Sequence, residues 1–167
     1  MASAFHLVVL LGLSSGLWMG ANAKCPKKDC CKVCPPGWTT LNSRCFMFVY
    51  EEKDWSDAEK SCVDIQGNLA SLHDEKDYKL LRNMVKMATG KDKQTWIGGY
   101  DAVKEGEWKW SDGTPFDYMN WGKDEPNNFK KIEHCMEFNY NEKDHLNDWK
   151  CEWKRSYICG RDMQNKD

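Results

Sequence analysis

The segment 125–148, EPNNFKKIEHCMEFNYNEKDHLND, decides how this chain of 167 residues is interpreted. It offers three carboxylates and two amides as one candidate ligand set, at Glu125, Asn127, Glu133, Asn147 and Asp148. Calcium takes six to eight oxygen ligands, so an oxygen-only set of this size suits Ca²⁺ better than zinc. No His-x-x-x-His pair or cysteine-rich set lies nearby in the sequence to favour a softer metal. The segment therefore predicts a calcium site.

Pro126 separates the acid of Glu125 from the amide of Asn127. An X–Pro bond adopts the cis form far more readily than other peptide bonds. A cis bond at this point would let the neighbouring side chains point at one ion. Each of these residues is common in turns, so the prediction depends on the whole set and not on any one member.

The residues before this segment predict a long ordered loop and several short strands. Residues 111–131 are rich in Gly, Pro, Asp and Asn, and a loop of that length in a small domain is usually functional or disordered. Its aromatic residues favour a loop packed on the body of the domain. Strands are predicted at 95–100, 107–110, 135–138 and 156–159, where apolar or alternating runs occur.

Two helices are predicted upstream. The first begins at the N-cap Asp54, buries a stripe and ends at Gly67 in a left-handed conformation; the stripe residues are Trp55, Ala58, Cys62 and Ile65. The second begins at Asp74, has acids in its first turn and ends at Gly90. Its buried stripe is Tyr78, Leu81, Val85 and Ala88. Together with the strands this predicts an α+β domain.

The N-terminus predicts secretion. Residues 1–23 carry no charged side chain and end in Ala-Asn-Ala, so we expect a signal peptide that is cleaved after Ala23. A membrane span is disfavoured because it needs about 20 apolar residues and this run is interrupted by Ser and Gly. We expect a Cys-rich arm at 24–36, one globular domain at 37–162 and a tail at 163–167. A formal net charge of −2 with mixed signs argues against a nucleic-acid partner.

Nine cysteines cannot all pair within one chain. Three of them, Cys25, Cys30 and Cys31, lie in the arm. They predict an interchain disulfide, and hence a disulfide-linked homo-oligomer. The alternatives are a local pair with one capped thiol, or a zinc site that also uses Cys34. The adjacent pair Cys30-Cys31 does not reproduce the usual zinc spacing.

These motifs together resemble one family. The motifs are Cys34-x10-Cys45, Trp96-Ile97-Gly98-Gly99, Glu125-Pro126-Asn127, Asn147-Asp148 and the spacing of Cys135, Cys151 and Cys159. They resemble the long form of the C-type lectin-like domain, from Cys34 to Cys159. The short chain with its signal segment is also similar to small secreted fish lectins and their type II antifreeze relatives.

The resemblance implies pairings and ligands. The disulfides would be Cys34–Cys45, Cys62–Cys159 and Cys135–Cys151. The principal calcium site would use Glu125, Asn127, Glu133, Asn147 and Asp148. An auxiliary calcium site would use Asp101, Glu105 and Glu133, with Asn128 where an acid is usual. Leu146 stands where the family usually has an aromatic residue, so local packing is expected to differ.

The resemblance also implies a function. The Glu-Pro-Asn form is the family's mannose-type motif, in which calcium coordinates two vicinal sugar hydroxyls. The expected partners are glycans of cell surfaces or glycoproteins, with agglutination in innate defence, venom or mucus. The alternatives are a galactose-specific lectin, an ice-binding protein and a venom-type protein that binds no sugar. No enzyme is expected, because His73, His134 and His145 show no recognisable nucleophile or triad. Candidate sugar contacts are Trp121, Trp149 and Trp153.

Overall fold

The computed structural model of the chain describes residues 32–139 and 145–165. The expected signal peptide at 1–23, its cleavage site and Cys25, Cys30 and Cys31 lie outside these residues, as does most of the expected arm. Within the described residues, no helix combines the length and the apolar character that a membrane span requires.

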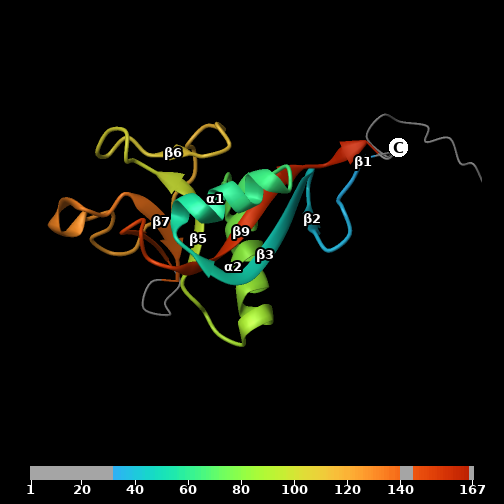
Figure 1. Cartoon of the computed structure of the whole chain (residues 1–167), viewed down its shortest axis with the longest axis horizontal. Coiled ribbons are helices and arrows are strands. Elements are labelled where there is room, and N and C mark those ends of the chain that lie inside the picture. The colour runs from blue at the N-terminus through green and yellow to red at the C-terminus, as the bar shows by residue number, and fades with distance from the viewer. Residues whose placement is uncertain (1–31, 140–144, 166–167) are drawn as a thin grey trace, which may run out of the picture.

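The described residues form an α+β fold with two helices and a mixed sheet, as predicted (Figure 1). The N-terminal elements are β1 (Lys32–Val33), β2 (Thr39–Leu41), β3 (Arg44–Lys53), α1 (Trp55–Asp64), β4 (Asn68–Leu69) and α2 (Glu75–Thr89). The remaining elements are β5 (Thr95–Tyr100), β6 (Lys109–Trp110), a 3₁₀ turn (Phe129–Lys131), β7 (Cys135–Phe138), β8 (Leu146–Trp149), β9 (Arg155–Asp162) and β10 (Gln164–Asn165).

The main sheet has the strand order β2-β3-β9-β5-β7-β8, with β4 paired to β9 and β6 paired to β5. Only the pairing of β5 with β9 is parallel among the strand pairs of the described residues. Strand β1 pairs with β10 in a separate two-stranded sheet, so the two ends of the described domain lie together. In Figure 1 this small sheet lies at the end of the molecule away from β7.

Helix α1 begins at the predicted residue, but the left-handed residue that follows it is not the predicted one. Asp54 accepts a hydrogen bond from the backbone N–H of Asp57 at 2.9 Å, as an N-cap residue does. The left-handed residue after the helix is Gln66, with φ of 62°, and not Gly67. Gly67 is required for close packing instead, since a Cβ there would lie 2.7 Å from the carbonyl oxygen of Gly160. Ile65 is 38% exposed, so its predicted burial is wrong; the helical stripe stops one turn earlier.

Helix α2 matches its predicted limits. The Asp74 side chain accepts from the backbone N–H groups of the first turn, and Gly90 ends the helix with φ of 77°. Tyr78, Leu81 and Val85 are buried. Ala88 is exposed, so its predicted burial is wrong; the buried stripe of the helix ends at Val85.

Strands β5 and β7 have the predicted bounds, whereas β6 is shorter than predicted and β9 is longer. The longer strands β3 and β8 were not predicted, nor were the short strands β1, β2, β4 and β10. The alternating side chains of β5 explain how the two helices are placed. Trp96 packs in the cluster that contains Ala58 of α1, and Ile97 packs in the cluster that contains Leu81 of α2. Successive residues of a strand point to opposite faces, so α1 and α2 cover opposite faces of the sheet.

Three disulfides cross-link the described residues. Cys34 is bonded to Cys45, Cys62 to Cys159 and Cys135 to Cys151, which are the pairs that the resemblance implies. The bond between Cys62 and Cys159 joins α1 to β9 across 97 residues of sequence. This bond ties the first helix to the strand that lies at the centre of the sheet.

Replacing both Cys62 and Cys159 with alanine should lower the free energy of unfolding by about 5 kcal/mol, because the crosslink constrains a long loop of the unfolded chain. The same change at Cys34 and Cys45, which are separated by 11 residues, should cost only about 3 kcal/mol. Urea denaturation under non-reducing conditions measures both losses. Equal losses would contradict the argument from loop length.

Candidate functional site

Strand β8 carries two residues of the predicted ligand set. Its antiparallel pairing with β7 places Asn147 opposite Glu137 and Asp148 opposite Met136. Asn147 and Asp148 are buried, with exposed fractions of 1% and 0%. The pairing of β7 with β8 therefore holds these two polar side chains of the site in place.

The loop that contains Glu125 is fastened to this strand pair. The carboxylate of Asp148 accepts the backbone N–H of Asn127 at 3.0 Å through Oδ1 and that of Asn128 at 2.7 Å through Oδ2. The peptide bond between Glu125 and Pro126 is cis. Farther back, Gly122 donates its backbone N–H to the carbonyl of Leu146 at 2.9 Å. Leu146 itself is fully buried in the core.

Glu125 and Asn127 form the open edge of the site. The side-chain amide of Asn127 donates to Oε2 of Glu125 at 2.6 Å. Asn127 is exposed and Glu125 is partly exposed, in contrast to the buried pair on β8. An acceptor and a donor therefore face solvent side by side.

Glu133 precedes β7 and is only 1% exposed. Its Oε2 accepts the backbone N–H of Phe129 at 3.0 Å. Its Oε1 is buried and has no hydrogen-bond partner among the described residues. A buried carboxylate oxygen without a partner is costly, and a bound cation would satisfy it.

The raised pKa values of these side chains also favour a bound cation. The pKa of Glu125 is raised to about 7. Burial is the largest cause, and the neighbouring carboxylates of Asp148 and Glu133 contribute to the rise. Burial likewise raises the pKa of Glu133, and the charge of Asp148 adds to the effect. Like charges held together in a partly dry site favour a cation among them. The residues present therefore fit a calcium ion, through carboxylate oxygens and the amides of Asn127 and Asn147.

Two supporting residues escaped the sequence analysis. Glu137 on β7 is fully buried, and its carboxylate accepts from Nε of Arg155 at 2.9 Å and from the amide of Asn147 at 3.3 Å. Burial raises the pKa of Glu137 to about 7, against the lowering effect of Arg155. This ion pair fixes the amide of Asn147. The available signal was a lone acid inside the buried run of β7, with Met136 and Phe138 on either side.

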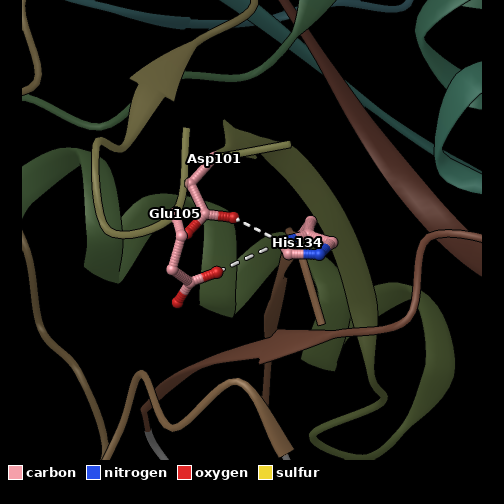
Figure 2. Close-up of side chains that lie close together, drawn as sticks. All are labelled: Asp101, Glu105 and His134. Carbon is pink, nitrogen blue, oxygen red and sulfur yellow. Dashed lines mark hydrogen bonds and ion pairs between the residues drawn. The ribbon is translucent and has the colours of Figure 1, made fainter. Parts of the chain in front are cut away.

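The predicted auxiliary set is brought together in part (Figure 2). Asp101 and Glu105 lie beside His134, which the sequence analysis did not assign to a site. Glu133 contributes its backbone N–H, which donates to Oδ1 of Asn128 at 3.0 Å. The side-chain amide of Asn128 donates to Glu105. Asn128 thus links the two acidic groups of the domain.

The three candidate tryptophans differ in exposure. Trp121 packs against Trp108 with ring centroids 4.8 Å apart and contacts the core. Trp149 packs against the second core cluster and lies 5.8 Å from Trp153. Trp153 is 50% exposed. Trp153 is therefore the member of the three with the most surface available to a ligand.

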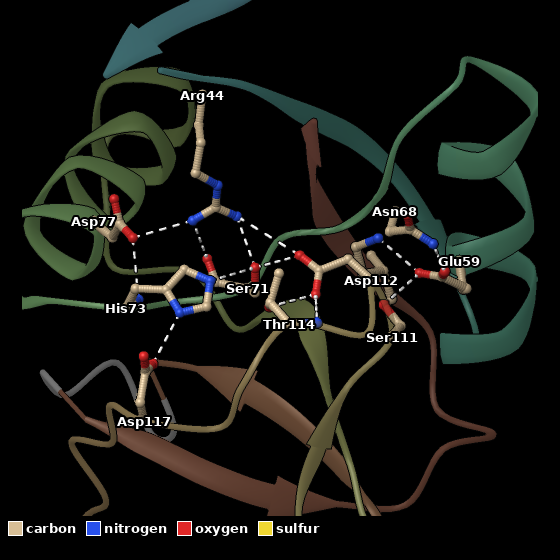
Figure 3. A network of polar contacts seen from close by, with 11 residues as sticks. Arg44, Glu59, Asn68, Ser71, His73, Asp77, Ser111, Asp112, Thr114 and Asp117 are labelled. Atoms are coloured by element: carbon tan, nitrogen blue, oxygen red, sulfur yellow. Dashed lines mark hydrogen bonds and ion pairs between the residues drawn. The ribbon is translucent and has the colours of Figure 1, made fainter. Parts of the chain in front are cut away.

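His73 lies in a polar network that its sequence context did not indicate (Figure 3). Its Nδ1 lies 2.9 Å from Asp117, and its Nε2 lies 3.2 Å from Oγ of Ser71, in the order of a Ser-His-Asp triad. Ser71, however, is fully buried, donates its hydroxyl proton to Asp112 and accepts from Arg44 at 2.7 Å. A buried and fully bonded hydroxyl cannot reach a substrate. The network holds the long loop against β3, and the hydrogen bond from His73 lowers the pKa of Asp117.

Replacing Arg155 with leucine should lower the free energy of unfolding by about 3–5 kcal/mol, because Glu137 would be left as an unpaired buried charge. Adding Glu137→Gln in the same chain should recover part of the loss, since it removes that charge. Urea denaturation of the wild type, both single variants and the double variant completes the cycle. Strictly additive losses would show that the pair does not act as a unit.

Comparison with known proteins supports this architecture. The family model described as the lectin C-type domain matches residues 51–161. The chain is 40% identical over 163 residues to the galactose-specific lectin nattectin of Thalassophryne nattereri, covering 98% of this chain and 100% of that protein. It is 46% identical over 118 residues to ladderlectin of Oncorhynchus mykiss, covering 71% of this chain and 62% of ladderlectin. The structure of the herring type II antifreeze protein is similar with a TM-score of 0.73 at 30% identity, over 78% of this chain and 100% of that one.

Proposed function

The chain belongs to the C-type lectin domain family, and we propose that it is a secreted, calcium-dependent lectin whose sugar site is formed by the loop at Glu125 and Asn127, by Glu133 and by strand β8. One observation carries the proposal. Buried Glu133 has a carboxylate oxygen without a partner among the described residues, beside the carboxylates of Glu125 and Asp148. A divalent cation would offset two of these three negative charges.

The ligands of that cation would be Glu125, Asn127, Glu133, Asn147 and Asp148. Bound calcium supplies open coordination positions, which two vicinal hydroxyls of a sugar can fill. Asp148 keeps the loop in place through its two backbone hydrogen bonds. At the open edge, the carboxylate of Glu125 accepts a hydrogen bond from one hydroxyl. The amide of Asn127 donates to the other.

The order of acid and amide at this edge favours mannose-type sugars. Glu125 places the acceptor first and Asn127 places the donor second, which is the mannose-type arrangement in the family that the sequence resembles. A galactose preference is the second candidate, because the galactose-specific nattectin is similar along nearly the whole chain. An ice-binding role is a third, since the antifreeze structure shares the fold. Thermal hysteresis in a solution of the purified protein would identify that role.

Multivalency would make weak sites effective. The open edge of the site is formed by an exposed and a partly exposed side chain, so a single sugar should bind at about millimolar Kd. Joining several sites on one particle raises the effective affinity without any new contact. We propose that Cys25, Cys30 and Cys31 in the arm provide the interchain link, after removal of residues 1–23. The resulting oligomer would crosslink glycans of cell surfaces or glycoproteins.

Calcium binding tests the site directly. Titration calorimetry on the oxidised protein should detect uptake of Ca²⁺, and Glu133→Gln should weaken it by about 10- to 100-fold, because one ligating charge is removed. Glu75→Gln is the matched control, since Glu75 is an exposed acid of α2 that pairs with Lys79. Unchanged affinity in Glu133→Gln, or equal losses in both variants, would refute the assignment.

Sugar preference tests the role of the open edge. The wild type should be retained on mannose resin in calcium and released by EDTA or free mannose. Exchanging the groups, as Glu125→Gln with Asn127→Asp, should shift retention toward galactose by about tenfold or more, since donor and acceptor trade places. A glycan array with and without calcium measures the shift. An unaltered sugar profile in the double variant would show that these two residues do not set the preference.

A further inference from the structure

Asp101, Glu105 and His134 form a compact group outside the proposed sugar site. Tyr100 on β5 pairs with Cys135 on β7, and the two strands are antiparallel. Asp101, which follows Tyr100, therefore lies beside His134, which precedes Cys135. The backbone N–H of Asp101 donates to the carbonyl of His134 at 3.2 Å. His134 in turn donates its N–H to Trp149 on β8 at 3.2 Å. The backbones of two members are therefore fixed by the sheet.

The donor atoms of the group have the spacing of metal ligands (Figure 2). Nδ1 of His134 lies 3.0 Å from Oδ1 of Asp101 and 3.5 Å from Oε2 of Glu105. All three ligand atoms lie within 4.8 Å of one another. Ligands about 2.0–2.1 Å from a zinc ion at tetrahedral angles stand about 3.3 Å apart. The three atoms thus need little movement to surround one ion.

The surroundings of this group favour a bound cation. Asp101 is 2% exposed, and its Oδ2 accepts the backbone N–H of Gly106 at 2.8 Å, which leaves Oδ1 directed at His134. Such a hydrogen bond orients a ligand from outside the coordination sphere. One imidazole carries at most one positive charge, so the two carboxylates keep an uncompensated negative charge. Glu105, with a side chain that is 57% exposed, leaves a path from solvent.

We propose that the place expected for an auxiliary calcium site, where His134 joins Asp101 and Glu105, instead takes a divalent cation of the zinc class. Imidazole nitrogen suits zinc and its neighbours in the transition series, whereas calcium takes oxygen ligands. The site goes beyond the proposed lectin function, because it uses none of the five sugar-site ligands. Asn128 is its link to that site, since its side chain bonds Glu105 and its backbone N–H bonds Asp148.

Zinc calorimetry in saturating calcium tests the proposal, using oxidised protein with any free thiol alkylated. The wild type should bind Zn²⁺, and Co²⁺ should give the visible absorption of a protein-bound ion. His134→Gln should weaken zinc binding by about tenfold or more. His73→Gln, the matched histidine control, should bind zinc like the wild type. His134→Asp should favour calcium over zinc, because the set becomes oxygen-only.

Two outcomes of the zinc titrations, and a third in a sugar-site variant, would overturn the second site. One is equal zinc affinity in His134→Gln and the wild type, with both proteins folded by thermal denaturation. The other is complete displacement of zinc by calcium. Glu125→Gln separates this site from the sugar site: zinc binding that persists in that variant while sugar binding is lost supports two independent sites. Loss of zinc binding in Glu125→Gln would place the zinc in the sugar site and refute the proposal.

Discussion

The carboxylate of Asp148 holds the ligand loop on the sheet, and the geometry of the sugar site depends on this contact. Two backbone N–H groups of the loop donate to its two oxygens, so this contact fixes the loop through main-chain atoms. The ion pair between Glu137 and Arg155 stands behind it and positions the neighbouring amide of Asn147. The site is thus a charged assembly stabilised from the core outward.

The helices were predictable because their signals are local. Asp54, Asp74 and Gly90 occupy the caps that their chemistry suits, and the apolar spacing identified the buried faces. Ile65 and Ala88 were misplaced because the last residue of a stripe is buried only if a neighbouring element reaches it. Strand β3 was missed because its outer half is exposed and charged, so its apolar pattern fades before the strand ends.

The candidate site was predictable as a set of oxygen ligands, but its supporting contacts were not. Sequence spacing can indicate that acids and amides converge, yet it carries no information on which distant residue neutralises them. Arg155 reaches Glu137 across 18 positions, and His134 meets Asp101 across 33. These encounters are set by strand register. The Ser71–His73–Asp117 alignment was missed for the same reason, since Asp117 approaches His73 only through the folded loop.

The pairing of β1 with β10 has a consequence for any covalent assembly of this chain. That small sheet lies at one pole of the domain, whereas β7 and the strands beside it lie toward the other (Figure 1). Subunits joined by the cysteines that precede β1 in the sequence would meet at the first pole. Their ligand loops, beside β7 and β8, would then point away from the junction. Such a particle would bridge two surfaces more readily than it would grip neighbouring sugars on one chain.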